Sequence, residues 1–175
     1  MSYTQIKTAF RFAAHKHNGQ LRKGTDLPYI IHPTDVGMYL NNLRSQNDIV
    51  IAGYLHDTLE DTDTTYDELL VTFGPRVADA VLAVTETDKI KAYENAKHYS
   101  ADALMVKTAD LFCNVSDIKT EFDTVGDTVF KKFSNGKDTL KHYKKLAQLL
   151  KKKAKFMPLF QSSLDETLTM IDSMS

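Results

Sequence analysis

An acidic segment with one histidine, LHDTLEDTDTTYDEL (55–69), is the part of the chain whose residue types and spacing most clearly indicate chemistry. If it continues the preceding helix, His56, Asp57, Glu60 and Asp61 share one face and apolar side chains fill the other. Carboxylates this close together repel one another unless they are solvated or surround a cation. The face is therefore either an acidic helix end in open water or part of a metal site. Imidazole nitrogens and carboxylate oxygens are ligands for zinc, manganese or iron.

A metal site needs further ligands, and two distant segments could supply them. In LPYIIHPTD, His32 precedes Pro33 and so lies at a helix entrance held by a stiff backbone. In LMVKTADLFCNVSDI, Asp110 lies near the middle of a predicted helix between apolar residues, where an unpaired carboxylate would be costly. One cation bound by four side chains would explain all three segments: His32, His56, Asp57 and Asp110.

Helical spacing dominates the elements that must position these residues, and no stretch alternates as a β-strand would. We therefore predict an all-α fold in which a loop over 18–28 follows the first helix. Thr65 and Glu68 form a capping box for a short helix that ends at Gly74. The other helices are predicted over 33–44, 48–60, 75–85, 88–98, 101–118, 136–155 and 159–172. The lysine-rich stretch 144–155 predicts a solvated helix face, with a phosphate-binding or partner surface as the alternative.

The composition indicates a single domain spanning residues 1–175. Lys and Arg number 22 and Asp and Glu 23, for a net charge of −1, so we expect neither a nucleic-acid partner nor a membrane surface. The single Cys113 excludes an internal disulfide and suits a reducing compartment. Without a signal-peptide pattern or a long apolar run, we expect a cytoplasmic protein. The sequence leaves its oligomeric state open.

The order of these residues is one separate histidine, then an adjacent His-Asp pair, then a distant aspartate. This pattern resembles the signature of the HD superfamily of metal-dependent phosphohydrolases. Four segments resemble, in order, the hydrolase domain of RelA/SpoT enzymes: HNGQLRKGTDLPYIIHP, LHDTLEDTDTTYDEL, FGPRVADAVLAVTETDK and VKTADLFCNVSDI. The resemblance covers about residues 5–150 and implies a bundle of about ten helices. It also implies a stand-alone small alarmone hydrolase that uses manganese. Such enzymes remove the 3′-diphosphate of guanosine tetra- and pentaphosphate, giving GDP or GTP and pyrophosphate.

The resemblance also implies roles for individual residues. The metal ligands would be the four side chains named above. Glu60 and Asp61 match the catalytic acid pair, whose two roles the sequence does not divide. The expected substrate contacts are Arg22, Lys23, Tyr29, Lys107, Asn114 and Tyr143. For three of these an alternative is open, because Tyr29 could pack, Lys107 could pair with Asp110 or Asp117, and Tyr143 could fill the core.

Two positions depart from the pattern of the family. Leu111 and Ser116 stand where a basic residue and an arginine are common, and Arg and Lys differ from each other in how they grip phosphate. The departures leave the identity of the nucleotide open. The alternatives are ppApp or pApp, the 2′-phosphate of NADPH, and a deoxynucleotide. A non-catalytic nucleotide-binding partner is a further hypothesis from another class.

Overall fold

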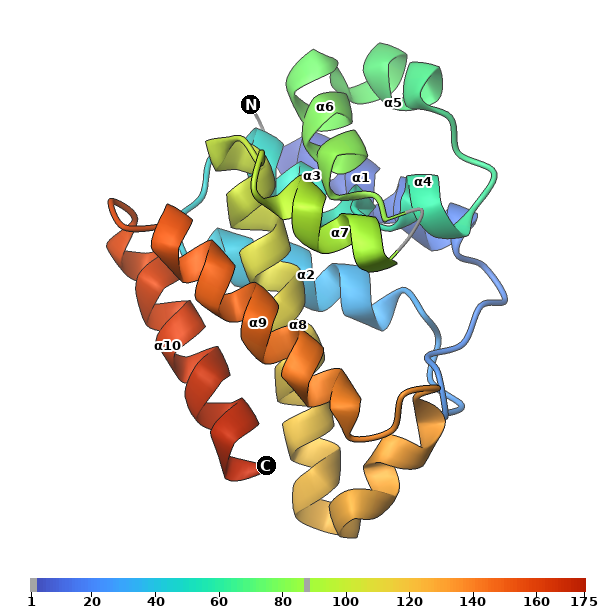
Figure 1. The fold of residues 1–175 in the computed structure, drawn as a ribbon. Coiled ribbons are helices and arrows are strands. Elements are labelled where there is room, and N and C mark those ends of the chain that lie inside the picture. Colours follow the sequence, from blue (N-terminus) through green and yellow to red (C-terminus); the bar gives the residue numbers. More distant parts are fainter. Residues whose placement is uncertain (1–2, 87–88) are drawn as a thin grey trace.

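The computed structural model describes residues 3–86 and 89–175, and its fold is a bundle of helices (Figure 1). The helices of this part of the chain are α1 (Tyr3–Lys16), α2 (Ile31–Asn42), α3 (Asn47–Leu55), α4 (Thr58–Asp61), α5 (Tyr66–Phe73), α6 (Pro75–Val84), α7 (Lys89–Ala96), α8 (Ala101–Val125), the 3₁₀ helix η1 (Gly126–Lys132), α9 (Asp138–Lys153) and α10 (Pro158–Ser173). The only extended pairing among the described residues is an isolated bridge between Leu21 and Pro28. The all-α prediction is confirmed.

The long helix α8 runs through the centre of the bundle (Figure 1). It packs against α2, α3, α6, α9 and α10. Its buried side of Ala, Leu, Val and Ile residues forms part of a continuous apolar core. Because α8 crosses beneath both α2 and α3, a polar residue in its middle faces the ends of those two helices.

Two glycines allow α2 and α3 to cross closely. A Cβ atom at Gly37 would lie 2.5 Å from the Tyr54 ring, and one at Gly53 would lie 2.5 Å from Leu40 Cδ1 and 3.3 Å from the Gly37 Cα. No side chain fits between the two backbones at this point. The close crossing brings the first turn of α2, with His32, near the end of α3, where His56 follows.

The capping prediction for α5 is confirmed, since the Thr65 hydroxyl accepts a hydrogen bond from the Glu68 backbone N–H. Gly74 precedes α6 with a φ of 87°, which favours glycine, and Pro75 begins that helix. These local signals fix the ends of the two helices that follow the acidic segment.

The prediction of one helix over 48–60 is wrong. The helix ends at Leu55, and α4 starts only at Thr58. The Thr58 hydroxyl donates to the Leu55 carbonyl at 2.7 Å, and His56 Nδ1 lies 2.9 Å from the Gly53 carbonyl. Side chains that bond to carbonyls in this way compete with continuation of the helix. His56 and Asp57 therefore lie in the turn between α3 and α4.

Two further boundaries differ from the predictions. Helix α8 continues to Val125 rather than residue 118, and the 3₁₀ helix after it was not predicted. Helix α2 begins at Ile31, so His32 lies inside its first turn.

Within the described residues, no helix is both long and apolar enough to cross a membrane.

Candidate metal centre and active site

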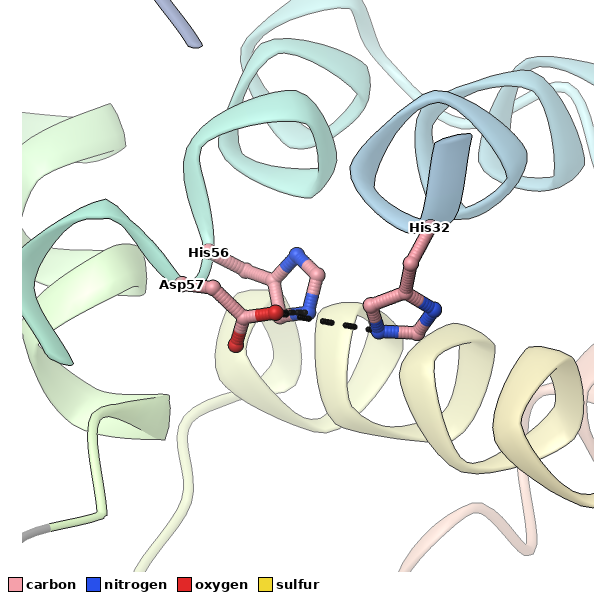
Figure 2. Close-up of side chains that lie close together, drawn as sticks. All are labelled: His32, His56 and Asp57. Carbon is pink, nitrogen blue, oxygen red and sulfur yellow. Dashed lines mark ion pairs between the residues drawn. The ribbon is translucent and has the colours of Figure 1, made fainter. Parts of the chain in front are cut away.

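Four side chains from α2, α8 and the turn between α3 and α4 converge on one point. The Nε2 atom of His32 lies 3.2 Å from Asp110 Oδ1 and 3.7 Å from Asp57 Oδ2. The Nε2 atom of His56 lies 3.0 Å from Asp57 Oδ2 and 3.7 Å from Asp110 Oδ1. Figure 2 shows His32, His56 and Asp57 pointing toward one another above α8. One ligand atom from each of these three lies within 4.8 Å of the others.

The orientation of His56 suits metal binding. Its Nδ1–H donates to the Gly53 carbonyl, which leaves Nε2 directed at the two carboxylates. This buried Nε2 has no hydrogen-bond partner among the described residues. A backbone carbonyl that fixes one ring nitrogen while the other faces the site is the arrangement found at metal-binding histidines. The donor set of two imidazoles and two carboxylates fits a divalent cation.

The pKa shifts within the four-residue cluster also favour a bound cation. Burial alone would lower the pKa of His56, but the carboxylates of Asp57 and Asp110 raise it to about 10. Burial alone would raise the pKa of Asp57, yet the neighbouring His56 and His32 hold it well below its usual range. The imidazolium of His56 thus acts as a counter-ion between two carboxylates. A divalent cation could take over that role.

The two acids of α4 lie differently with respect to the site. Glu60 Oε2 accepts a hydrogen bond from the Glu86 backbone N–H at 2.7 Å, and Glu60 lines a cavity together with His32, Asp57 and Asp110. Partial burial, together with nearby Asp57, Glu86 and Asp61, raises the pKa of Glu60 to about 7. Partial burial and Asp57 also raise the pKa of Asp61, which is not among the residues that line the cavity.

The cavity has a volume of about 620 Å³ and holds His32, Asp57 and Asp110 in its wall. All six expected substrate contacts line it: Arg22, Lys23, Tyr29, Lys107, Asn114 and Tyr143. The structure therefore brings these six residues to the same cavity as the proposed ligands.

Three of these six bond directly to the proposed metal ligands. The Tyr29 hydroxyl donates to Asp57 Oδ2 at 2.7 Å, and Asn114 Nδ2 donates to Asp110 Oδ1 at 2.5 Å. Lys107 pairs with Asp110 at 3.0 Å, which was one of its two alternative partners. These contacts orient the carboxylates.

The other three have different neighbours. Arg22 Nη2 donates to Asp117 Oδ2 at 2.7 Å and to Asn114 Oδ1 at 3.2 Å. Lys23 Nζ lies 5.9 Å from the centroid of the Phe133 ring. Burial and the nearby Asp110 raise the pKa of Tyr143 to about 12, so its hydroxyl stays protonated at neutral pH.

Several cavity residues carried no assigned role in the sequence: Glu86, Tyr93, Phe133 and Lys145. Glu86 pairs with Lys107 at 2.5 Å, a contact between residues distant in sequence. Two of the four had a signal: Glu86 lies within the quoted segment FGPRVADAVLAVTETDK, and Lys145 belongs to the lysine-rich stretch for which a phosphate-binding surface was the alternative.

Comparison with known proteins identifies the class of this fold and site. The HD domain family matches residues 9–122, which is more than half of the chain. The chain therefore belongs to the HD domain family, as the sequence motifs indicated.

Particular relatives carry more specific names. A protein of Aquifex aeolicus (strain VF5) named guanosine-3′,5′-bis(diphosphate) 3′-pyrophosphohydrolase is 46% identical over 106 residues, which are 61% of this chain and 15% of that protein. The Mus musculus protein of the same name, MESH1, is 42% identical over 124 residues, covering 65% of this chain and 69% of the relative. This chain thus spans only a small part of the Aquifex relative.

A solved structure supports the fold. The chain described as a metazoan ortholog of SpoT that hydrolyses ppGpp superposes with a TM-score of 0.78 at 24% identity, covering 97% of this chain and 96% of that one. A Listeria monocytogenes structure, lmo0812, gives a TM-score of 0.67 at 28% identity over 80% of this chain and 96% of the other.

Proposed function

We propose that this chain is a metal-dependent phosphohydrolase that removes the 3′-diphosphate of guanosine tetra- and pentaphosphate. The observation that carries the proposal is the convergence of His32, His56, Asp57 and Asp110. Three of these four, all but His56, line a cavity large enough for a nucleotide. The names of the Aquifex and mouse relatives support this choice of substrate. Residues 1–175 act as one domain in this proposal, and the setting is cytoplasmic.

The reaction transfers the intact 3′-diphosphoryl group to water. Water attacks the phosphorus atom attached to the 3′ oxygen, the bond between them breaks, and the 3′ oxygen takes up a proton. The products are GDP or GTP and pyrophosphate. A divalent cation, for which we propose manganese, would supply Lewis-acid stabilisation of the phosphate and lower the pKa of water when bound by the four ligands.

The residues of the chain have separate roles in this mechanism. Glu60 faces the cavity with a pKa of about 7, so it can accept a proton from the attacking water near neutral pH. Asp61 does not line the cavity, and its backbone N–H donates to the Asp57 carbonyl at 2.9 Å. Tyr29 and Asn114 hold the carboxylates of Asp57 and Asp110 in place through the hydrogen bonds described above. Arg22, Lys23 and Tyr143 form the nucleotide-facing wall.

The test is a product assay on a nucleotide panel. The purified chain is incubated with Mn²⁺ and guanosine tetraphosphate, ppApp, pApp, NADPH or a deoxynucleoside triphosphate, and the products are separated by anion-exchange chromatography. We expect GDP and pyrophosphate from guanosine tetraphosphate, with no reaction in EDTA or in Asp57→Ala. Faster turnover of another member of the panel would reassign the substrate. Tight binding without turnover at saturating Mn²⁺ would favour a non-catalytic partner.

A further inference from the structure

The cations in the cavity wall differ in whether they are already neutralised. Arg22 is paired with Asp117 at 2.7 Å. Lys107 lies between Glu86 and Asp110, at 2.5 and 3.0 Å. These two cations therefore contribute little net positive charge to a nucleotide, which brings several negative charges into the cavity.

Lys145 of α9 lines the same cavity in a different environment. Its Nζ atom lies 4.3 Å from the centroid of the Tyr93 ring of α7. Within the described part of the chain, no ion pair joins it to a carboxylate. A cation–π contact holds an ammonium group in position and leaves its N–H donors available to an anion. Lys145 is thus a cation held in position without a direct ion pair among the described residues, and the nearby Glu94 pairs with Lys97 instead.

The surroundings of Lys145 add to its positive charge. Lys97 Nζ lies 5.4 Å from the centroid of the same Tyr93 ring, and Lys153 Nζ donates to the Lys97 carbonyl at 2.7 Å. Glu94 pairs with Lys97 at 2.6 Å. Lys97 and Lys145 therefore lie beside the same ring where α7 meets α9, and these two cations outnumber the one carboxylate, Glu94, that pairs with Lys97. Such an excess of positive charge favours an anion.

We propose that Lys145 binds a phosphate group of the substrate other than the one that is hydrolysed. The inference rests on the proposed function, in which the ligand cluster from α2, α8 and the turn before α4 takes the reacting group, whereas Lys145 comes from α9. For guanosine tetraphosphate the remote group is the 5′-diphosphate. A cavity of about 620 Å³ lies in the range of sites that enclose a whole ligand, so both groups fit within one site. Lys145 would then determine specificity for nucleotides that carry phosphate at both ends.

The first experiment compares two substrates, guanosine tetraphosphate and guanosine 3′-diphosphate without 5′ phosphates. We expect Lys145→Met to lower the ratio of kcat/KM for the first over the second by ~10-fold, as for loss of one charge-assisted hydrogen bond. Lys145→Arg should restore most of the ratio. Lys152→Met is the matched control, since Lys152 is exposed on the same helix and does not line the cavity. An unchanged ratio in Lys145→Met would overturn the proposal.

The second experiment measures binding without turnover. Isothermal titration in EDTA compares GDP with guanosine for the wild type and for Lys145→Met. We expect GDP to bind more tightly than guanosine to the wild type, and the variant to lose ~10-fold of that preference. A wild type that shows no preference for GDP would contradict the subsite. Failure to hydrolyse guanosine tetraphosphate, with the GDP preference intact and dependent on Lys145, would contradict only the proposed function.

Discussion

Replacing Lys107 by Met should destabilise the metal-free protein strongly. The Lys107, Glu86 and Asp110 side chains are only 12%, 18% and 9% exposed, and the ammonium group lies within 3.0 Å of both carboxylates. Removing one partner of such a buried network leaves uncompensated charge and costs ~3 kcal/mol or more. For a chain of this size, a loss of about 3 kcal/mol lowers Tm by roughly 6–12 °C.

Metal should reverse part of that loss. Without the ammonium group, Asp110 and its neighbours form a more negative site, so Mn²⁺ should bind the variant more tightly and raise its Tm more than that of the wild type. The assay is thermal unfolding followed by circular dichroism, in EDTA and in a Mn²⁺ series. Glu86→Gln and the double variant complete a cycle that measures the coupling of Lys107 and Glu86.

The expected coupling between Lys107 and Glu86 exceeds 1 kcal/mol, because the pair is short and mostly removed from water. A Tm shift of less than about 3 °C in EDTA, corresponding to about 1 kcal/mol, would refute the assigned network. Equal Mn²⁺ stabilisation of the wild type and Lys107→Met would refute the electrostatic link between this pair and the ligand cluster.

Three further predictions concern other parts of the site. The pKa of Glu60 is raised to about 7 and its deprotonated form is the base, so kcat/KM should rise with pH through about 7. The Glu60→Gln variant should lose this rise in the pH profile and ~100-fold of kcat. It should still bind Mn²⁺ in a titration. Tyr29→Phe should weaken Mn²⁺ affinity by ~10-fold in calorimetry, since Asp57 loses an orienting hydrogen bond, and an unchanged affinity would contradict that role. The Gly37→Ala variant should have a free energy of unfolding in urea that is lower by ~1–3 kcal/mol, because the added Cβ would meet the Tyr54 ring. A stabilised variant would show that the crossing of α2 and α3 relaxes.

Much of the candidate site was predictable because its signals are local. His32 beside Pro33, the adjacent His56 and Asp57, and an acid in the middle of an apolar helix all stand out in the sequence. Amphipathic spacing likewise predicted the all-α fold and the approximate positions of most helices. The capping of α5 followed from two residue types three positions apart.

The parts that were missed depend on contacts that spacing does not encode. The break after Leu55 contains neither Gly nor Pro and results from side chains that bond to the carbonyls of the preceding turn. The prediction therefore placed Glu60 beside His56 on one helix. In the structure Glu60 belongs to the separate helix α4 and lines the cavity, whereas His56 lies in the preceding turn. The pairing of Lys107 with Glu86 joins two elements, and no pattern within either of them indicates it.

The close approach of α2 and α3 at Gly37 and Gly53 has a consequence for engineering the metal preference. His32 lies in the first turn of α2 and His56 directly follows α3, and the two helices touch backbone against backbone at this contact. An ion of another radius would require a different distance between the two imidazoles, and a closely packed crossing leaves little room for the helices to shift. Redesign for a larger or smaller ion should therefore begin at the glycine contact and leave the ligands alone.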